Sequence, residues 1–176
     1  MVWVALADPL DGALELGAMT TYGHVEPHPD VQRGWSLLAQ AAGPNARCLV
    51  DLGHHLPGAN IEQVVSRLAM TGRLGGFHFN DSKYGDDDLT VGSINPYQLF
   101  LVLLELLAFG GGALPDLAYM IDESHNVKDP IEDLIQATDE IQVSLARALL
   151  VDLHALAEAQ DADDPARAAE VLQSAY

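Results

Sequence analysis

Histidine and aspartate side chains recur at the ends of three apolar segments, with a spacing that could hold metal ions. The first segment ends in VDLGHH, which separates Asp51 from His54 by three residues, and the second, GGFHFN, carries His78. The third ends in MIDESHN, where Asp122 and His125 are again three residues apart. Carboxylates and imidazoles without thiolates suit Mn²⁺, Mg²⁺ or Co²⁺ better than a thiolate-dependent zinc site. The pattern therefore predicts a divalent-metal site if the three segments converge.

The loop that follows the second segment, DSKYGDDDL, adds further carboxylates around one lysine, Lys83. Carboxylates crowded so closely repel one another unless water or a cation separates them. The loop is therefore either an ordinary solvated surface or part of the metal site. Under the second interpretation Asp86 and Asp88 are the candidate ligands, and Asp81 and Asp87 are their neighbours.

Each candidate also has a structural interpretation. His78 could be a core histidine with satisfied hydrogen bonds, His54 and His55 could be loop residues, and Asp122 could cap a turn. One Asp-x-x-His pair is weak evidence, whereas its combination with ligands at three successive segment ends is considerably more specific. The remaining histidines, which fall outside this pattern, are interpreted as non-functional: His24, His28 and His154.

Strand-like and helix-like segments alternate along the chain from about residue 45. Short β-rich runs predict strands, and helices are predicted from apolar spacing, proline at the first position and glycine or aspartate at the ends. The predicted strands are 46–53, 74–80 and 117–122, and the predicted helices are 58–72, 95–112, a long helix over 130–160, and 165–175.

This alternation predicts an α/β fold with parallel strands joined by crossover helices. The carboxyl ends of parallel strands share one edge, where active sites gather, so the dispersed ligands are expected to converge there. Side chains also alternate along a strand. Gly76, His78 and Asn80 should therefore point to one side and Phe77 and Phe79 to the other.

The overall composition restricts the class of protein. The 176 residues suffice for one domain, and 26 acidic against 8 basic residues give a net charge of −18. That charge argues against nucleic acid or an anionic membrane as a partner, because phosphate contacts need clustered Lys and Arg. Cys48 is the single cysteine, and no signal peptide or membrane span is recognised, so a cytoplasmic location is expected.

At these residues the sequence resembles the L-rhamnose isomerase family, which are aldose–ketose isomerases with a xylose-isomerase-like TIM barrel. The resemblance runs from about residue 43 to the C-terminus and is most specific in GGFHFNDSKYGDDDL and MIDESHNVKDPIEDLI. It implies two divalent ions, with Mn²⁺ first and Co²⁺ or Mg²⁺ as alternatives. It also implies L-rhamnose or a related aldose as substrate, hydrogen transfer between C1 and C2, and a tetrameric assembly in full-length members.

The resemblance also implies a role for each candidate ligand. Asp51 would bridge the two ions, and His78 and Asp122 would complete the first, structural site. The second, catalytic site would use three more ligands: His54, Asp86 and Asp88. Together with Asp51, these three are the expected catalytic residues.

Two departures from the family pattern shape the domain prediction. The family's Glu-x-Lys pair is missing from the preceding segment, so residues 1–42 are expected to be a divergent N-terminal segment with a helix near 30–42. Residues 43–176 are expected to be a partial (β/α)8 TIM barrel with three to four βα units, whereas a complete barrel takes roughly 250 residues. The chain is therefore predicted to be a fragment or truncated isomerase, with an inactive metal-binding segment or a related epimerase as alternatives.

Overall fold

A computed structural model describes residues 47–56, 58–84, 87–123 and 128–176. The residues from Cys48 to Tyr176 belong to one compact unit. The helix expected near 30–42 and the predicted boundary between residues 42 and 43 lie outside the described residues. The same holds for two predicted site residues, Asp86 and His125.

The three predicted strands form one parallel sheet. β1 (Cys48–Asp51), β2 (Leu74–Phe79) and β3 (Ala118–Ile121) are hydrogen-bonded in the order β1-β2-β3, and both pairings are parallel. The prediction of an α/β fold with parallel strands is therefore confirmed. Within the described ranges the sheet has three strands, so the barrel itself stays a prediction.

The two faces of this sheet differ in chemistry. Phe77 and Phe79 are almost fully buried, with exposed fractions of 0% and 2%, and their rings stack on Tyr119 of β3. On the opposite face His78 pairs in register with Asp51 of β1 and Met120 of β3. The predicted alternation thus directs the aromatic side chains of β2 into the core and leaves its histidine on the other face.

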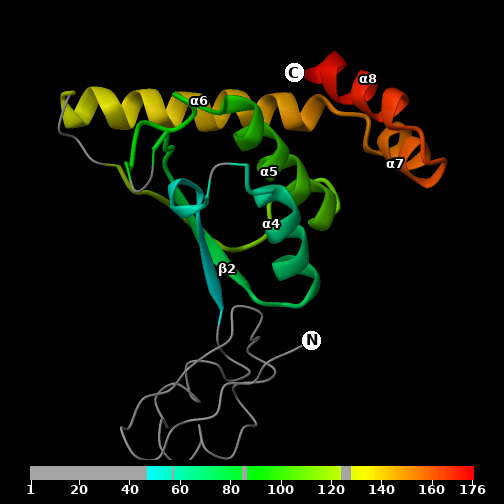
Figure 1. The fold of residues 1–176 in the computed structure, drawn as a ribbon, viewed down its shortest axis with the longest axis horizontal. Helices are drawn as coiled ribbons and strands as arrows, with labels where there is room; N and C mark the ends of the chain where they lie inside the picture. Colours follow the sequence, from blue (N-terminus) through cyan, green and yellow to red (C-terminus); the bar gives the residue numbers. More distant parts are fainter. Residues whose placement is uncertain (1–46, 57, 85–86, 124–127) are drawn as a thin grey trace, which may run out of the picture. The chain divides into compact units, whose positions relative to one another are not determined.

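Two helices cover the aromatic face of the sheet. α4 (Ile61–Met70) and α5 (Pro96–Phe109) lie on the same side of β2 in Figure 1, and their apolar side chains join the core cluster of Phe77 and Phe79. Asn60 and Asn95 cap the two helices by accepting hydrogen bonds from backbone N–H groups of their first turns. These caps fix where each loop from the sheet enters its helix.

Three further helices follow β3: α6 (Pro130–Leu150), α7 (Leu153–Asp161) and α8 (Pro165–Ala175). α6 packs along α5 through a row of small buried side chains, Ala137, Ser144 and Ala148. Asp129 caps α6 and Pro130 is its first residue, as predicted. No helix in the described part of the chain is long and apolar enough to cross a membrane.

The prediction of one helix over 130–160 is wrong. The chain leaves the helical conformation at Val151, whose φ and ψ are −67° and 130°, and α7 starts two residues later. Asp152 stabilises this break, because its carboxylate accepts hydrogen bonds from the backbone N–H groups of His154 and Ala155. The apolar spacing continues through the break, so the local capping interaction prevails over the period.

Between α4 and α5, a half-buried glutamate gives stability a pH dependence. Burial raises the pKa of Glu105 and the charge of Glu62 raises it further, while a hydrogen bond with Ser66 opposes both effects. Glu105 is therefore harder to ionise in the folded protein than in the unfolded chain. As a result, the free energy of unfolding falls as the pH rises from the ordinary pKa of a glutamate to the raised pKa of Glu105. Glu105→Gln should remove this penalty and raise the free energy of unfolding above that range, by up to about 1 kcal/mol since solvent screens the group.

The measurement is urea unfolding across the weakly acidic to neutral range. Glu158→Gln is the matched control, because that side chain is 71% exposed. The control should keep the wild-type pH dependence, whereas Glu105→Gln should flatten it. An equal pH dependence in Glu105→Gln and the wild type would contradict the prediction.

Candidate metal centre

The three-residue spacing between Asp51 and His54 is bridged by a single turn of 3₁₀ helix, η1 (Leu52–His54), directly after β1. Side chains at positions i and i+3 eclipse one another in such a turn. The turn brings His54 Nδ1 to 2.6 Å from Asp51 Oδ1. Asp51 also caps the turn, since its Oδ1 accepts a hydrogen bond from the backbone N–H of Gly53 at 3.2 Å. The local sequence therefore builds one carboxylate–imidazole pair.

The second pair forms across the sheet. Asp51 and His78 are register partners on neighbouring parallel strands, and His78 Nδ1 lies 3.0 Å from Asp51 Oδ2. Asp122 follows β3, where its backbone N–H donates to the carbonyl of Phe79 at 3.1 Å. Its Oδ2 lies 2.9 Å from the same nitrogen of His78. Parallel pairing thus joins side chains that lie 27 and 44 positions apart in the chain.

Five of the six predicted ligands fall into two groups that share Asp51. One group is Asp51, His78 and Asp122, and the other is Asp51, His54 and Asp88; the ligand atoms of each lie within 4.8 Å of one another. The two oxygens of Asp51 face different histidines, Oδ1 toward His54 and Oδ2 toward His78. This is the arrangement expected of a carboxylate between two cations.

Electrostatics keep the shared carboxylate ionised. Burial by itself raises the pKa of Asp51, but hydrogen bonds from His54, Asn80 and His78 outweigh that effect, so the pKa of Asp51 lies below its ordinary value. An ionised carboxylate is a suitable ligand for a hard divalent cation. The donor set of the two groups, carboxylate oxygens and imidazole nitrogens, therefore fits Mn²⁺, Mg²⁺ or Co²⁺.

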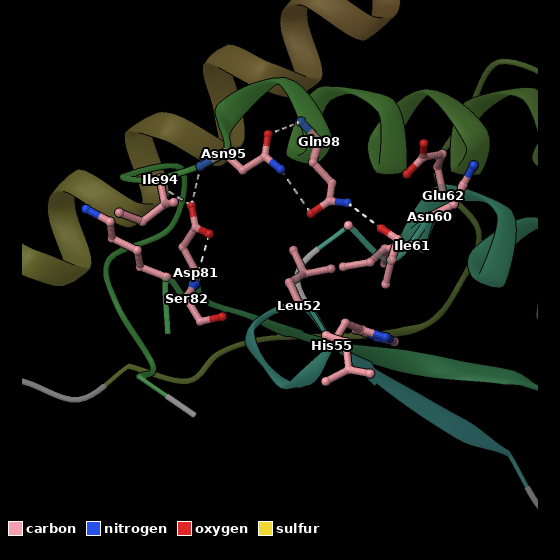
Figure 2. Close-up of a pocket in the computed structure, with 14 residues that line it drawn as sticks. Leu52, His55, Asn60, Ile61, Glu62, Asp81, Ser82, Ile94, Asn95 and Gln98 are labelled. Carbon is pink, nitrogen blue, oxygen red and sulfur yellow. Dashed lines mark hydrogen bonds between the residues drawn. The ribbon is translucent and has the colours of Figure 1, made fainter. Parts of the chain in front are cut away.

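The aspartates of the loop after β2 have different roles. Asp81 is structural: its Oδ2 accepts hydrogen bonds from the backbone N–H groups of Ile94 and Asn95, just before α5 (Figure 2). Its own backbone forms an antiparallel bridge with Leu89, with hydrogen bonds of 2.9 and 2.7 Å. Asp81 thus closes the loop at both ends, which explains its position in the cluster without any metal.

Asp87 is also structural, whereas Asp88 points to the candidate site. The Oδ2 of Asp87 accepts hydrogen bonds from the backbone N–H groups of Lys83 and Tyr84, and these bonds lower its pKa. Asp88 belongs to the group with Asp51. The hydrogen bonds of Asp81 and Asp87 lie at exposed positions, so these two residues cap backbone N–H groups on a solvated surface.

Asn80, predicted only to point to the same side of the strand as His78, also has a role in the candidate site. Its side chain is buried, and its Nδ2 donates to Asp51 Oδ1 at 3.0 Å and to Asp88 Oδ1 at 3.1 Å, so one amide joins two carboxylates. Its Oδ1 accepts from the backbone N–H of Gly53 at 2.6 Å. A Cβ at Gly53 would lie 3.0 Å from that oxygen, so the glycine permits the close approach. The available signal was its place two residues after His78, on the same side of the strand.

A pocket of about 470 Å³ lies between the starts of α4 and α5 (Figure 2). Leu52, His55 and Asp81 line it, but none of the five described ligand candidates does. Burial lowers the pKa of His55, and the charge of Asp51 only partly opposes this. The two adjacent histidines thus have different surroundings: His54 lies beside Asp51, whereas His55 lines the pocket.

The histidines interpreted as non-functional are described only in part. His154 lies on α7, far along the chain from the candidate ligands, where its Nδ1 is 3.6 Å from Glu158 and its side chain is 84% exposed. His24 and His28 lie outside the described residues, as do Asp86 and His125. The role of Asp86 as a ligand therefore stays a prediction.

This sequence is similar to two probable sugar isomerases. No protein-family model matches this sequence. The chain is 55% identical over 142 residues to a probable sugar isomerase of Mesorhizobium japonicum and 54% identical over 142 residues to one of Rhizobium meliloti. Each match covers 80% of this chain but 33% of the relative, so the chain spans about a third of the length of the curated relatives it matches.

Proposed function

We propose that this chain carries the two-metal centre of an aldose–ketose isomerase of the L-rhamnose isomerase type. The observation that carries the proposal is the position of Asp51 between two groups of candidate ligands contributed by three adjacent parallel strands and the segments that follow them. The similarity to two probable sugar isomerases supports the same class of reaction. Mn²⁺ is the proposed ion, with Co²⁺ or Mg²⁺ as alternatives.

Each candidate ligand is assigned to one of the two proposed ions. Asp51, His78 and Asp122 would hold one ion, and Asp51, His54 and Asp88, with Asp86, would hold the other. A divalent cation bound here would supply Lewis acidity toward neighbouring oxygens of an open-chain aldose. His54 and Asp122 are the most exposed of the described candidates, with side-chain exposures of 47% and 51%, so the sugar would approach from their side.

We further propose that the sheet is a portion of a (β/α)8 barrel. Leu49 and Met120, on the same face of the sheet as His78, are 44% and 39% exposed, as expected of interior positions that further strands would cover. This observation and the matched third of the relatives' length favour a second candidate function. In that case the chain on its own binds the two ions without turning over sugar.

The test is to incubate the purified chain with Mn²⁺ and L-rhamnose, to assay for ketose, and to measure bound Mn²⁺ in parallel. Asp139→Asn is the matched control, because it removes one carboxylate from an exposed position on α6. The control should bind the metal and form ketose as the wild type does.

Each result separates the proposals. Ketose formation that requires Mn²⁺ supports the isomerase. Two bound ions without ketose support the second candidate, and a C3 epimer in place of ketose indicates an epimerase. A wild-type chain that binds fewer than two Mn²⁺ ions contradicts the proposed two-metal centre.

A further inference from the structure

A buried carboxylate on α6 contacts the loop that carries Asp88. The side chain of Asp133 is only 3% exposed, although it lies in the first turns of a helix whose other residues nearby are exposed. Its Oδ1 accepts a hydrogen bond from Thr90 Oγ1 and another from Lys128 Nζ at 3.2 Å. We call Thr90, Lys128 and Asp133 the anchor cluster. None of the three is a candidate ligand.

The carboxylate of Asp133 is costly to bury unless its charge is paired. Lys128 supplies the opposite charge to Asp133, and the hydroxyl of Thr90 supplies a hydrogen bond to an ionised acceptor, which is stronger than a bond between neutral groups. The hydrogen bond between Thr90 and Asp133 has a defined geometry, so it fixes the position of Thr90 relative to the start of α6.

Thr90 is two residues from Asp88, and the residues on either side of Thr90 also form hydrogen bonds that fix their positions. The backbone of Leu89 bridges Asp81, and the backbone N–H of Val91 donates to Glu123 Oε1 at 2.7 Å. Glu123 is next to Asp122 in the chain, so the loop is tied to the end of β3 as well as to α6. Contacts from two other elements therefore determine the path of the loop after Asp88.

Asp88 needs such support because its backbone is strained. Its φ is +44°, in the left-handed region that residues other than glycine rarely adopt. A strained conformation persists only where surrounding contacts determine it. The contact of Asp88 with Asn80 holds the carboxylate itself, whereas the anchor cluster holds the backbone that follows.

We propose that the anchor cluster positions Asp88 as a ligand, with Thr90 and Asp133 as positioning residues for the second ion only. This inference rests on the proposed function, since it assigns Asp88 to a metal. The first group, Asp51, His78 and Asp122, has no ligand in the loop. A change in the anchor cluster should therefore affect the two ions unequally.

The experiment is a Mn²⁺ titration of the full chain, followed by electron paramagnetic resonance, which counts the ions and gives the affinity of each. Thr90→Val removes the hydroxyl at nearly constant volume, and Thr90→Ser keeps it. Asp133→Asn provides an independent variant that removes the charge and keeps an acceptor oxygen. Asp88→Asn shows what weakening the second ion alone looks like, and circular dichroism establishes that each variant is folded.

Thr90→Val and Asp133→Asn should each weaken the second ion about 10- to 100-fold, the range for residues that orient metal ligands, and should leave the first ion unchanged. Thr90→Ser should restore wild-type affinity. Equal weakening of both ions, or no weakening of either, would overturn the inference while the proposed function stands. A wild-type chain that binds fewer than two ions overturns the proposed function, and the inference with it.

Discussion

Replacing Asp51 by asparagine is expected to weaken the binding of both Mn²⁺ ions at least about 100-fold, which exceeds the range for residues that only orient ligands. The reason is that the two oxygens of Asp51 face both groups of ligands, so a single substitution affects both. Asparagine keeps the shape and one acceptor oxygen, so the 3₁₀ turn after β1 and the contact with Asn80 can persist. Isothermal titration calorimetry with Mn²⁺ measures the loss.

Two further variants serve as controls for the Asp51→Asn result. Asp139→Asn changes the net charge by the same amount at an exposed position and should bind both ions as the wild type does. Asp122→Asn changes a carboxylate of the first group alone and should weaken one ion. If Asp51→Asn lost one ion and retained the other at full affinity, Asp51 would not be shared between the two groups.

Replacing Phe77 by alanine is expected to lower the free energy of unfolding by about 3–5 kcal/mol, the usual cost of removing a large aromatic side chain from a core. Phe77 is fully buried, and its ring stacks on Phe79 and Tyr119 at centroid distances of 5.5 and 6.1 Å. A loss of this size is a large part of the stability of a typical domain. Urea unfolding monitored by circular dichroism measures it.

Met120→Ala is the control for this prediction, because it shortens an apolar side chain on the other face of the same sheet. Met120 is 39% exposed, so its truncation should cost less than about 1 kcal/mol. Similar losses in the two variants would mean that the face of the sheet opposite Phe77 is covered in solution. That outcome would contradict the exposure of Met120 on that face.

The local features of the candidate site could be predicted from the sequence. The Asp51–His54 pair depends on one turn of backbone, and the direction of His78 depends on the two-residue period of a strand. The caps at Asp129 and Pro130 likewise involve neighbours in the chain. Each of these involves few residues, so residue type and spacing are sufficient to specify it.

The structural roles of Asp81 and Asp87 could not be predicted in the same way. Asp81, Asp87 and Asp88 have the same side chain and lie close together in the sequence, yet two cap backbone N–H groups and one joins the ligand group. The choice depends on the path of the loop relative to α5 and α6. Composition has no information about that path, because it gives the number of carboxylates and not their directions.

The sequence by itself therefore determined the alternation of strands and helices, the parallel pairing and the choice of candidate ligands for divalent ions. Only the tertiary structure decided that Asn80 joins two carboxylates and that α6 reaches back to Thr90. The physical reason is the range of the interactions. Turns, caps and side-chain alternation involve neighbouring residues, whereas contacts between positions tens of residues apart exist only after the sheet and its helices have packed.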